Sequence, residues 1–418
     1  MRTSGGAGGP SAATTRWGIL FLALFAGVFG AFQNGKMPAA LPTLTADLGL
    51  TLVEAGFAVS LLFALACAIG IVTGAIADYV GALRIITIGL VLSALASAAG
   101  GFATGPAGLF ASRVAEGLGV TAVFVAAPSM ILRAAAQRDQ RLAFGIWSGY
   151  MPAGVAIMIL ITPAAIALVG WRGLWWFNGV LLLAMAVVFD VATRTARDPA
   201  TSGGGLASLR ANVRAVLGAR GPWLLALCFA LYTATYLCVS SFLPTLLITT
   251  AGFAQAWAGT ATALIVALNV FGNLLGGVLL QRGVPRGTLI AIGAATMGTM
   301  SLVLYATDLG AIWKLAAAAA FSFVGGLLPS SIIAGAPMHA PAAAQVGTTN
   351  GLILQIGNAG QLAGPPIFAA LATLGGWSLA AWFTLALGLA GAAFGIGIAI
   401  HEKKAANLRR GGFQTRPQ

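Results

Sequence analysis

The chain has 418 residues, of which 59% are hydrophobic and only 7% are charged, and its mean hydropathy is strongly positive. A soluble protein of this length carries charge on about a quarter of its residues, so the composition excludes a soluble enzyme or binding domain. The net charge of +13 would suit a nucleic-acid partner, but the positions of the basic residues argue against one.

The apolar residues form repeated runs of about 20, the length that a helix needs to cross the hydrocarbon core of a bilayer. We therefore expect an all-α integral membrane protein. Residues 17–37 follow Arg16 and have the character of a signal peptide, but a counterpart in the second half of the chain identifies them as a first span. The twelve predicted transmembrane helices are 17–40, 52–77, 85–102, 107–132, 142–168, 174–192, 223–247, 257–280, 288–306, 312–333, 347–373 and 377–400.

The basic residues orient these helices. Of 22 Lys and Arg residues, 18 fall in alternate segments between the spans, which is the positive-inside bias and predicts that both termini are cytoplasmic. We expect a multi-pass protein of a bacterial inner membrane, monomeric, with the lipid bilayer and a small-molecule substrate as partners and no nucleic acid. The 18 residues are Arg2, Arg16, Arg84, Arg133, Arg138, Arg141, Arg194, Arg197, Arg210, Arg214, Arg220, Arg282, Arg286, Lys403, Lys404, Arg409, Arg410 and Arg416.

One long polar break, 193–222, divides the chain, and short motifs recur on either side of it. The break contains five arginines and a Ser-Gly-Gly-Gly run. Together with the predicted spans, this break divides the chain into five regions. They are a disordered tail (1–15), a six-helix bundle (16–192), a cytoplasmic linker (193–222), a second six-helix bundle (223–400) and a cytoplasmic tail (401–418). The recurring motifs, at nearly constant offsets, are 41–44 at 243–246, Gly74 at Gly277, and Gly170-Trp171 at Gly376-Trp377. Because the offset spans an even number of helices, the two halves are parallel repeats.

The stretch 74–84, between the second and third spans, resembles the signature loop of the major facilitator superfamily, G-x-x-[AS]-D-[RK]-x-G-[RK]-[RK]. The resemblance implies a twelve-helix secondary transporter built as 6+6, working by alternating access, with an inner gate at this loop and its echo at 277–286. It also implies that the Asp78 carboxylate latches the cytoplasmic ends of the two halves. The residues that agree with the pattern in type are Gly74, Ala77, Asp78, Gly81 and Arg84, and those of the echo are Gly277, Arg282 and Arg286.

Arg113 and Glu116 are the deepest charges in the chain. They are i and i+3 on the fourth predicted helix and therefore share a face. An ionisable residue inside a span is expensive and usually faces a polar interior. The segment resembles the helix-4 motif R-x-x-x-G of the superfamily, with Gly117 in register, and the resemblance associates this arginine with proton coupling. The alternative is a self-neutralising pair that only holds helix 4 to its neighbours.

Further polar residues lie within other spans. Gln33 and Lys36, in the first span, are too polar for a lipid face and are predicted to line water, although Lys36 has the length to reach the outer interface instead. Tyr232 and Tyr236 share a face of the seventh span. By resemblance they are candidates to line the cavity, whereas the amide pair of Asn269 and Asn273 favours a structural role.

No catalytic constellation is visible, so we expect no enzyme and no cofactor, with the proton gradient as the energy source. His339 and His401 are single and are predicted to be exposed, and no phosphate-binding P-loop occurs. The helix-5 pattern typical of drug antiporters is degraded here because Pro152 lies two positions late.

Together these features favour proton-coupled uptake of a small anion, with Arg113, Glu116, Lys36, Gln33, Tyr232 and Tyr236 as the substrate-binding or coupling residues. Proton-driven export of a metabolite, siderophore or drug is the first alternative. A non-transporting membrane sensor or scaffold is the second, although the 18-residue tail offers little surface for a partner.

Overall fold

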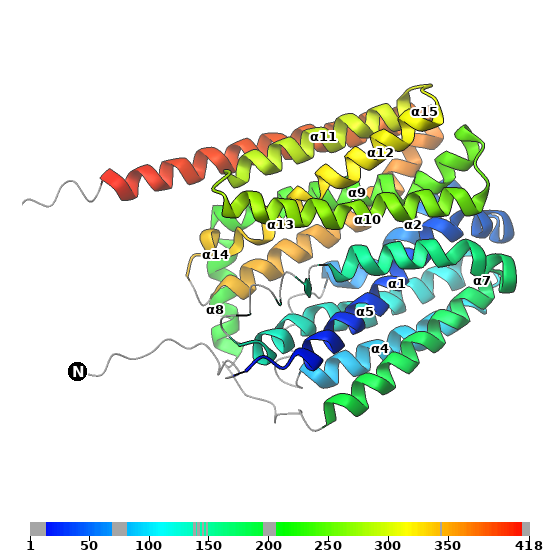
Figure 1. Cartoon of the computed structure of the whole chain (residues 1–418), viewed down its shortest axis with the longest axis horizontal. Helices are drawn as coiled ribbons and strands as arrows, with labels where there is room; N and C mark the ends of the chain where they lie inside the picture. Colours follow the sequence, from blue (N-terminus) through cyan, green and yellow to red (C-terminus); the bar gives the residue numbers. More distant parts are fainter. Residues whose placement is uncertain are drawn as a thin grey trace, which may run out of the picture. The chain divides into compact units, whose positions relative to one another are not determined.

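The chain is helical in the computed structural model, which describes residues 14–68, 82–136, 139, 143, 146–147, 149–194, 206–342 and 345–411. No strand occurs among these residues. The helices, labelled in Figure 1 where there is room, are α1 (Trp17–Leu48), α2 (Leu52–Ser60), the 3₁₀ helix η1 (Leu61–Phe63), α4 (Ala82–Gly100), α5 (Pro106–Ala134), α7 (Tyr150–Thr193), α8 (Leu206–Leu217), α9 (Arg220–Ala251), α10 (Gln255–Gln281), α11 (Arg286–Ala306), α12 (Ala311–Gly325), α13 (Leu327–Ile333), α14 (Ala336–His339) and α15 (Val346–Gly411).

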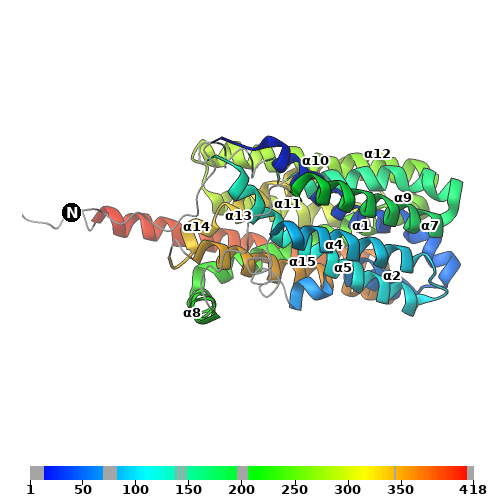
Figure 2. The ribbon, with the colours of Figure 1, turned by 90° about the horizontal axis from the view of Figure 1, so that it is seen from below.

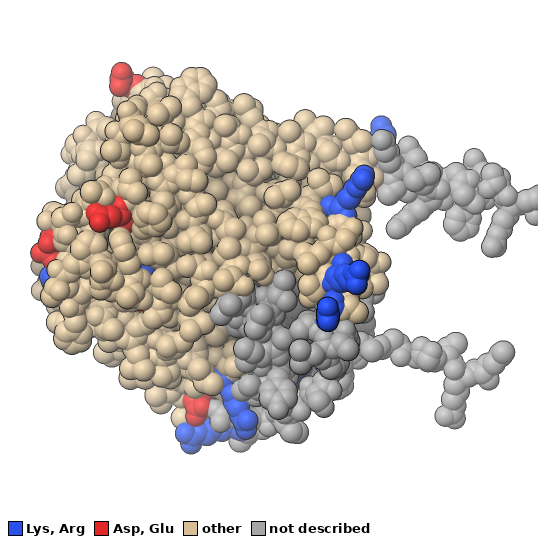
Figure 3. All heavy atoms as spheres, turned by 180° about the vertical axis from the view of Figure 1, so that it is seen from behind, with Lys and Arg blue, Asp and Glu red and all other residues tan. Residues whose placement is uncertain are grey.

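Most of these helices are long and apolar enough to cross a membrane. Within the described residues there are nine such candidate spans, and Leu52–Ala68 is a shorter apolar helix. On the face drawn in Figure 3, a broad surface has no charged side chains, and most of the acidic and basic groups lie toward its edges. A surface of this kind is suited to lipid rather than to water.

Two of the nine candidate spans are too long for one crossing and contain a glycine with positive φ. Gly170 in α7 has φ 69° and Gly376 in α15 has φ 72°, a backbone conformation that glycine adopts without a steric penalty. Each glycine marks a turn between two helices, close to the predicted breaks after residues 168 and 373. The predicted span 52–77 is described only as far as Ala68, so the total of twelve and the orientation of the termini stay predictions.

The chain packs as two compact units. Unit 1 comprises residues 1–36 and 72–203, and unit 2 comprises residues 37–71 and 204–418. α1 therefore begins in unit 1 and ends in unit 2, and α2 packs with the second half of the chain. The predicted boundaries at residues 192 and 223 stay a prediction, but the grouping of residues 37–71 with unit 2 was not visible in the sequence.

Unit 1 is held together by close contact between α4 and its neighbours α5 and α7. A Cβ atom added to Gly119 of α5 would lie 2.3 Å from the Oγ of Ser93 and 2.4 Å from the carbonyl oxygen of Gly89, both on α4. Small residues at a crossing allow two helix backbones to approach closely, which is how helices associate when lipid surrounds them. This crossing positions the polar groups of α4 and α5 within reach of each other.

Unit 2 is organised around α15, which packs against α9, α11 and α2. Glycines again mark the closest crossings: a Cβ on Gly272 of α10 would lie 1.8 Å from the carbonyl oxygen of Phe323 on α12. On α2, a Cβ at Gly56 would lie 2.8 Å from the carbonyl oxygen of Pro365 on α15. The same small-residue packing therefore builds both units.

Candidate functional site

The centre of unit 1 contains a fully buried ion pair on α5. The helix begins at Pro106, directly after an extended Gly105, and its first turns carry Arg113 and Glu116 one above the other. The Nη1 of Arg113 donates to the Oε2 of Glu116, and both side chains have 0% exposure. The local pair that the i, i+3 spacing indicates is therefore present, but it is not self-contained.

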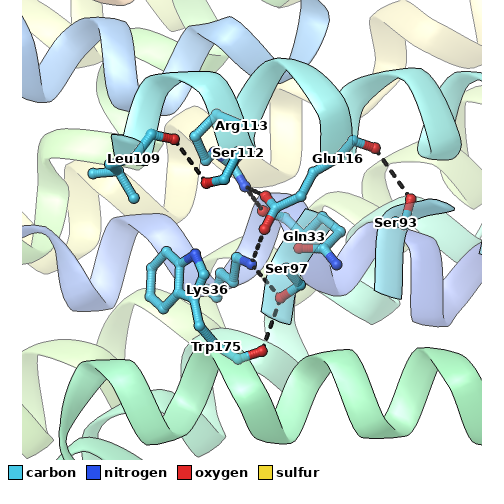
Figure 4. Close-up of polar contacts among 9 residues, drawn as sticks. All are labelled: Gln33, Lys36, Ser93, Ser97, Leu109, Ser112, Arg113, Glu116 and Trp175. Atoms are coloured by element: carbon cyan, nitrogen blue, oxygen red, sulfur yellow. Dashed lines mark hydrogen bonds and ion pairs between the residues drawn. The ribbon is translucent and has the colours of Figure 1, made fainter. Parts of the chain in front are cut away.

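Lys36 of α1 joins this pair. Its Nζ lies 2.6 Å from the Oε1 of Glu116 and 3.0 Å from the Oγ of Ser97 on α4, and the side chain has 0% exposure (Figure 4). The alternative in which Lys36 reaches the outer interface is therefore wrong. We refer to Lys36, Arg113 and Glu116 as the charged triad.

Two neighbours fix the position of the Lys36 ammonium group. The ring of Trp175 on α7 lies 4.3 Å from Nζ, within the range of a cation–π interaction. Ser97, which accepts from Lys36, donates in turn to the carbonyl oxygen of Trp175 at 2.9 Å. Helices α1, α4, α5 and α7 thus all contribute to one polar centre, as Figure 4 shows.

Gln33 lies one turn before Lys36 on α1 and faces the same centre. Its backbone carbonyl oxygen accepts from the Nη1 of Arg113 at 2.8 Å. Its side-chain amide has 0% exposure, and neither the nitrogen nor the oxygen has a hydrogen-bond partner among the described residues. The amide therefore has a hydrogen-bond donor and an acceptor that the described side chains of this centre do not use.

The triad carries a formal charge of +1, because two cations share one carboxylate. Removing one partner from a buried ion pair leaves an uncompensated charge and is costly. Protonation of Glu116 would leave Lys36 and Arg113 without their shared counter-ion, and an anion placed between them would restore it. The geometry can therefore exchange one negative group for another.

The two predicted tyrosines lie in unit 2, in a row of stacked rings. The ring centroids of Tyr232 and Tyr236 on α9 are 5.7 Å apart, and the rings of Phe229 and Phe321 continue the row at 5.9 Å on either side. The row is apolar apart from the two hydroxyl groups. It is an aromatic surface with no charge of its own.

The asparagines of α10 connect helices of unit 2. Asn269 donates to the carbonyl oxygen of Ser322 on α12 at 3.0 Å and lies 3.5 Å from the hydroxyl oxygen of Tyr232. Asn273 donates to the side-chain oxygen of Asn269 at 3.0 Å. These contacts suit the structural role that the sequence favours for the pair.

The gate residues have different surroundings. Gly74, Asp78 and Gly81 lie outside the described residues. Arg84 on α4 and Arg282 at the end of α10 are exposed, and Gly277 has no atom within 4 Å of an added Cβ.

Arg286, the last residue of the echo, is buried and ties together helix ends of unit 2. Its Nε lies 3.1 Å from the Oε1 of Glu402 on α15, and its Nη1 donates to the carbonyl oxygen of Ser331 at 2.6 Å. His339 is also buried, and its Nε2 lies 3.2 Å from the same Glu402 oxygen. The prediction that His339 is exposed is therefore wrong. Its partner Glu402 is 63 residues away in the sequence, so local spacing could not indicate this contact.

Ser97 and Trp175 are the site residues that sequence reasoning missed. Ser97 has a weak signal, since Gly89, Ser93 and Ser97 recur every four residues and give α4 a small, polar stripe. Trp175 follows the repeated Gly-Trp motif by four residues, but nothing in the sequence pairs it with Lys36.

Comparisons with known proteins agree with the fold. The family model of the Major Facilitator Superfamily matches residues 19–360. A Mycobacterium tuberculosis protein named "Probable nitrate/nitrite transporter NarK2" is 26% identical over 220 residues, which cover 52% of this chain and 54% of that protein. The chain thus spans about half the length of the curated relatives it matches.

Solved structures extend the likeness in fold over nearly the whole chain. Two crystal structures of a bacterial homologue of the human lysosomal transporter Spinster match it. The inward-facing occupied form has a TM-score of 0.74 at 16% identity, covering 95% of this chain and 98% of that one. The inward-facing unoccupied form has a TM-score of 0.68 at 18% identity, covering 93% and 96%. With its helical spans and its match over residues 19–360, this chain belongs to the Major Facilitator Superfamily.

Proposed function

We propose that this chain is a secondary transporter that moves a small monovalent anion together with a proton, with the charged triad as the binding and coupling centre. The observation that carries the proposal is the +1 charge of three fully buried side chains that share one carboxylate. Membership of a transporter superfamily supports the general activity, and the triad supports the class of solute.

Charge conservation gives the coupling a physical basis. In the unloaded state, the Glu116 carboxylate balances one of the two cations, which leaves +1. When Glu116 is neutralised by a proton and a monovalent anion takes its place, the total is again +1. Loading both species therefore adds no net charge to a buried site, whereas loading either one alone changes the charge that the site must bury.

The surrounding groups favour a compact oxygen-bearing anion. The guanidinium group of Arg113 and the ammonium group of Lys36 donate charge-assisted hydrogen bonds, the strongest kind available to an oxyanion. The buried amide of Gln33 adds a donor without adding charge. Nitrate and nitrite, which appear in the name of the Mycobacterium relative, are monovalent oxyanions of this kind and are the first solutes to test.

The test is uptake of isotope-labelled nitrate and nitrite into proteoliposomes under an imposed proton gradient. Wild-type protein should accumulate the anion on the alkaline side. Arg113→Met and Lys36→Met should each lower the uptake by about tenfold or more, because each removes a charge-assisted hydrogen bond. Arg133→Met, at an exposed arginine in the last turn of α5, is the matched control on the same helix as Arg113 and should transport normally.

Normal uptake by both triad variants would contradict the assignment of the site. An anion flux that runs against the proton flux would instead favour export by antiport. Monodisperse elution of each variant in detergent separates a lost site from a lost fold.

A further inference from the structure

We propose that α8 is an interfacial helix whose exposed arginine face binds the headgroups of anionic phospholipids in the cytoplasmic leaflet. The sequence Leu-Ala-Ser-Leu-Arg-Ala-Asn-Val-Arg-Ala-Val-Leu of α8 is amphipathic. Arg210, Arg214 and Leu217 are spaced i, i+4 and i+7, so they share one face, and all three are exposed. Leu217 has 45% exposure, so this face offers an apolar side chain beside the two arginines.

The opposite face of α8 is attached to unit 2. Val216 on this face is 1% exposed, and the side-chain oxygen of Asn212 lies 3.5 Å from the Nε2 of Gln345, just before α15. The helix is therefore docked through one face, and the arginines on the other face remain available to a partner.

The position of α8 suits the membrane interface. In Figures 1 and 2, α8 runs across the direction of the spanning helices of unit 2 and lies near the end where α9 begins. In the first turn of α9, Trp223 donates its indole N–H to the carbonyl oxygen of Leu217 at 2.9 Å. Tryptophan is enriched at the headgroup level of membranes, so this contact fixes the end of α8 at that level.

Charge decides the occupant. The positive-inside distribution leads us to expect α8 on the cytoplasmic side, where the leaflet contains anionic lipids. Two arginines and an apolar side chain on one face match a phosphate-bearing headgroup above acyl chains. An acidic soluble protein would use the arginines but would have no use for a leucine at the lipid boundary.

The experiment measures binding of phosphatidylglycerol to the purified full-length protein in detergent, by native mass spectrometry, with phosphatidylcholine as the neutral comparison. Wild-type protein should bind phosphatidylglycerol more tightly, and added salt should weaken the binding. The double variant Arg210→Gln/Arg214→Gln should bind it about 25-fold more weakly, since each basic residue near a membrane surface contributes about fivefold. Its affinity for phosphatidylcholine should be unchanged.

A matched control removes the same amount of charge elsewhere. Arg194→Gln/Arg282→Gln loses two exposed arginines that lie outside α8 and should change the affinity by less than about twofold. An equal loss in both double variants, or no loss in the α8 variant, would overturn the proposal. So would equally effective competition by free inorganic phosphate, which would indicate a soluble anion. Thermal unfolding in detergent without lipid shows whether each variant is folded, and none of these readouts depends on transport.

Discussion

The two units bury different kinds of polar cluster. Unit 1 buries the charged triad, whereas unit 2 buries stacked rings and amides. When residues 41–44 are aligned with residues 243–246, Lys36 aligns with Cys238, which is fully buried. For any offset between 203 and 206, the counterpart of Arg113 is an alanine of the run 316–320, and the counterpart of Glu116 carries no carboxylate. At these positions the first half of the chain carries charge and the second half does not, because the buried Arg286 of the second half lies elsewhere, at the helix ends beside Glu402.

This difference has an energetic consequence. Measured hydrogen bonds between helices in lipid contribute only about 0.6 kcal/mol on average, so the asparagines of unit 2 are individually weak contributors to stability. A broken buried ion pair costs several times more. We therefore expect the two clusters to respond very differently to the removal of one member.

The largest effect is expected for Glu116→Ala. This change leaves Lys36 and Arg113 as two buried cations without their shared counter-ion, so the free energy of unfolding should fall by about 3–5 kcal/mol. Denaturant unfolding in detergent micelles measures the loss. The triple variant Lys36→Met/Arg113→Met/Glu116→Ala removes the unpaired charges and should recover most of the stability. A triple variant as unstable as the single one would show that packing, rather than charge, causes the loss.

A second prediction tests whether the units are alike in packing. Gly119→Ala in unit 1 and Gly272→Ala in unit 2 each place a methyl group within 2.5 Å of a neighbouring helix, and each should lower the free energy of unfolding by about 1–3 kcal/mol. Gly277→Ala, on the same helix as Gly272 but with no atom within 4 Å of the added Cβ, is the control. It should be neutral or stabilising by up to about 1 kcal/mol, because alanine favours helix more than glycine does. If only one of the two variants lowered the free energy of unfolding, the two units would not depend on the same close helix packing.

A smaller loss is expected for Asn269→Ala in unit 2. The variant removes the 3.0 Å hydrogen bond to the carbonyl oxygen of Ser322 and the side-chain acceptor of Asn273, which keeps the backbone oxygen of residue 269. It should lower the free energy of unfolding by about 0.6–1.7 kcal/mol. Unfolding measurements check the value. A loss as large as that of Glu116→Ala would contradict the contrast between the two clusters.

The smallest effect is expected for Tyr232→Phe. Its hydroxyl oxygen lies 3.5 Å from the Nδ2 of Asn269, at the limit of a hydrogen bond, so the free energy of unfolding should change by less than about 0.5 kcal/mol. Under the proposed function, anion transport should also persist, because the change leaves the charged triad of unit 1 intact. Loss of transport without loss of stability would show that the tyrosine row contributes to the solute site.

The sequence predicted those features that depend on local spacing. Apolar runs indicated the spans, and the i, i+3 spacing indicated that Arg113 and Glu116 share a face, whereas the repeat indicated by the offset motifs stays a prediction. Partners distant in the chain were not predictable. Nothing in the sequence connects Lys36 with Glu116, 80 residues away, or His339 with Glu402. Helix periodicity shows which residues share a face, but it does not show which face of another helix they meet.

Under the proposed function, one anion and one proton occupy the charged triad together. A proton-uptake measurement tests this: nitrate is added to purified protein in weakly buffered detergent solution, and the change in proton concentration is recorded near neutral pH. The protein should take up protons as the anion binds, with at most one proton per anion, and Glu116→Gln should bind the anion with no proton uptake. Nitrate binding without proton uptake by the wild-type protein, or unchanged uptake by Glu116→Gln, would contradict it.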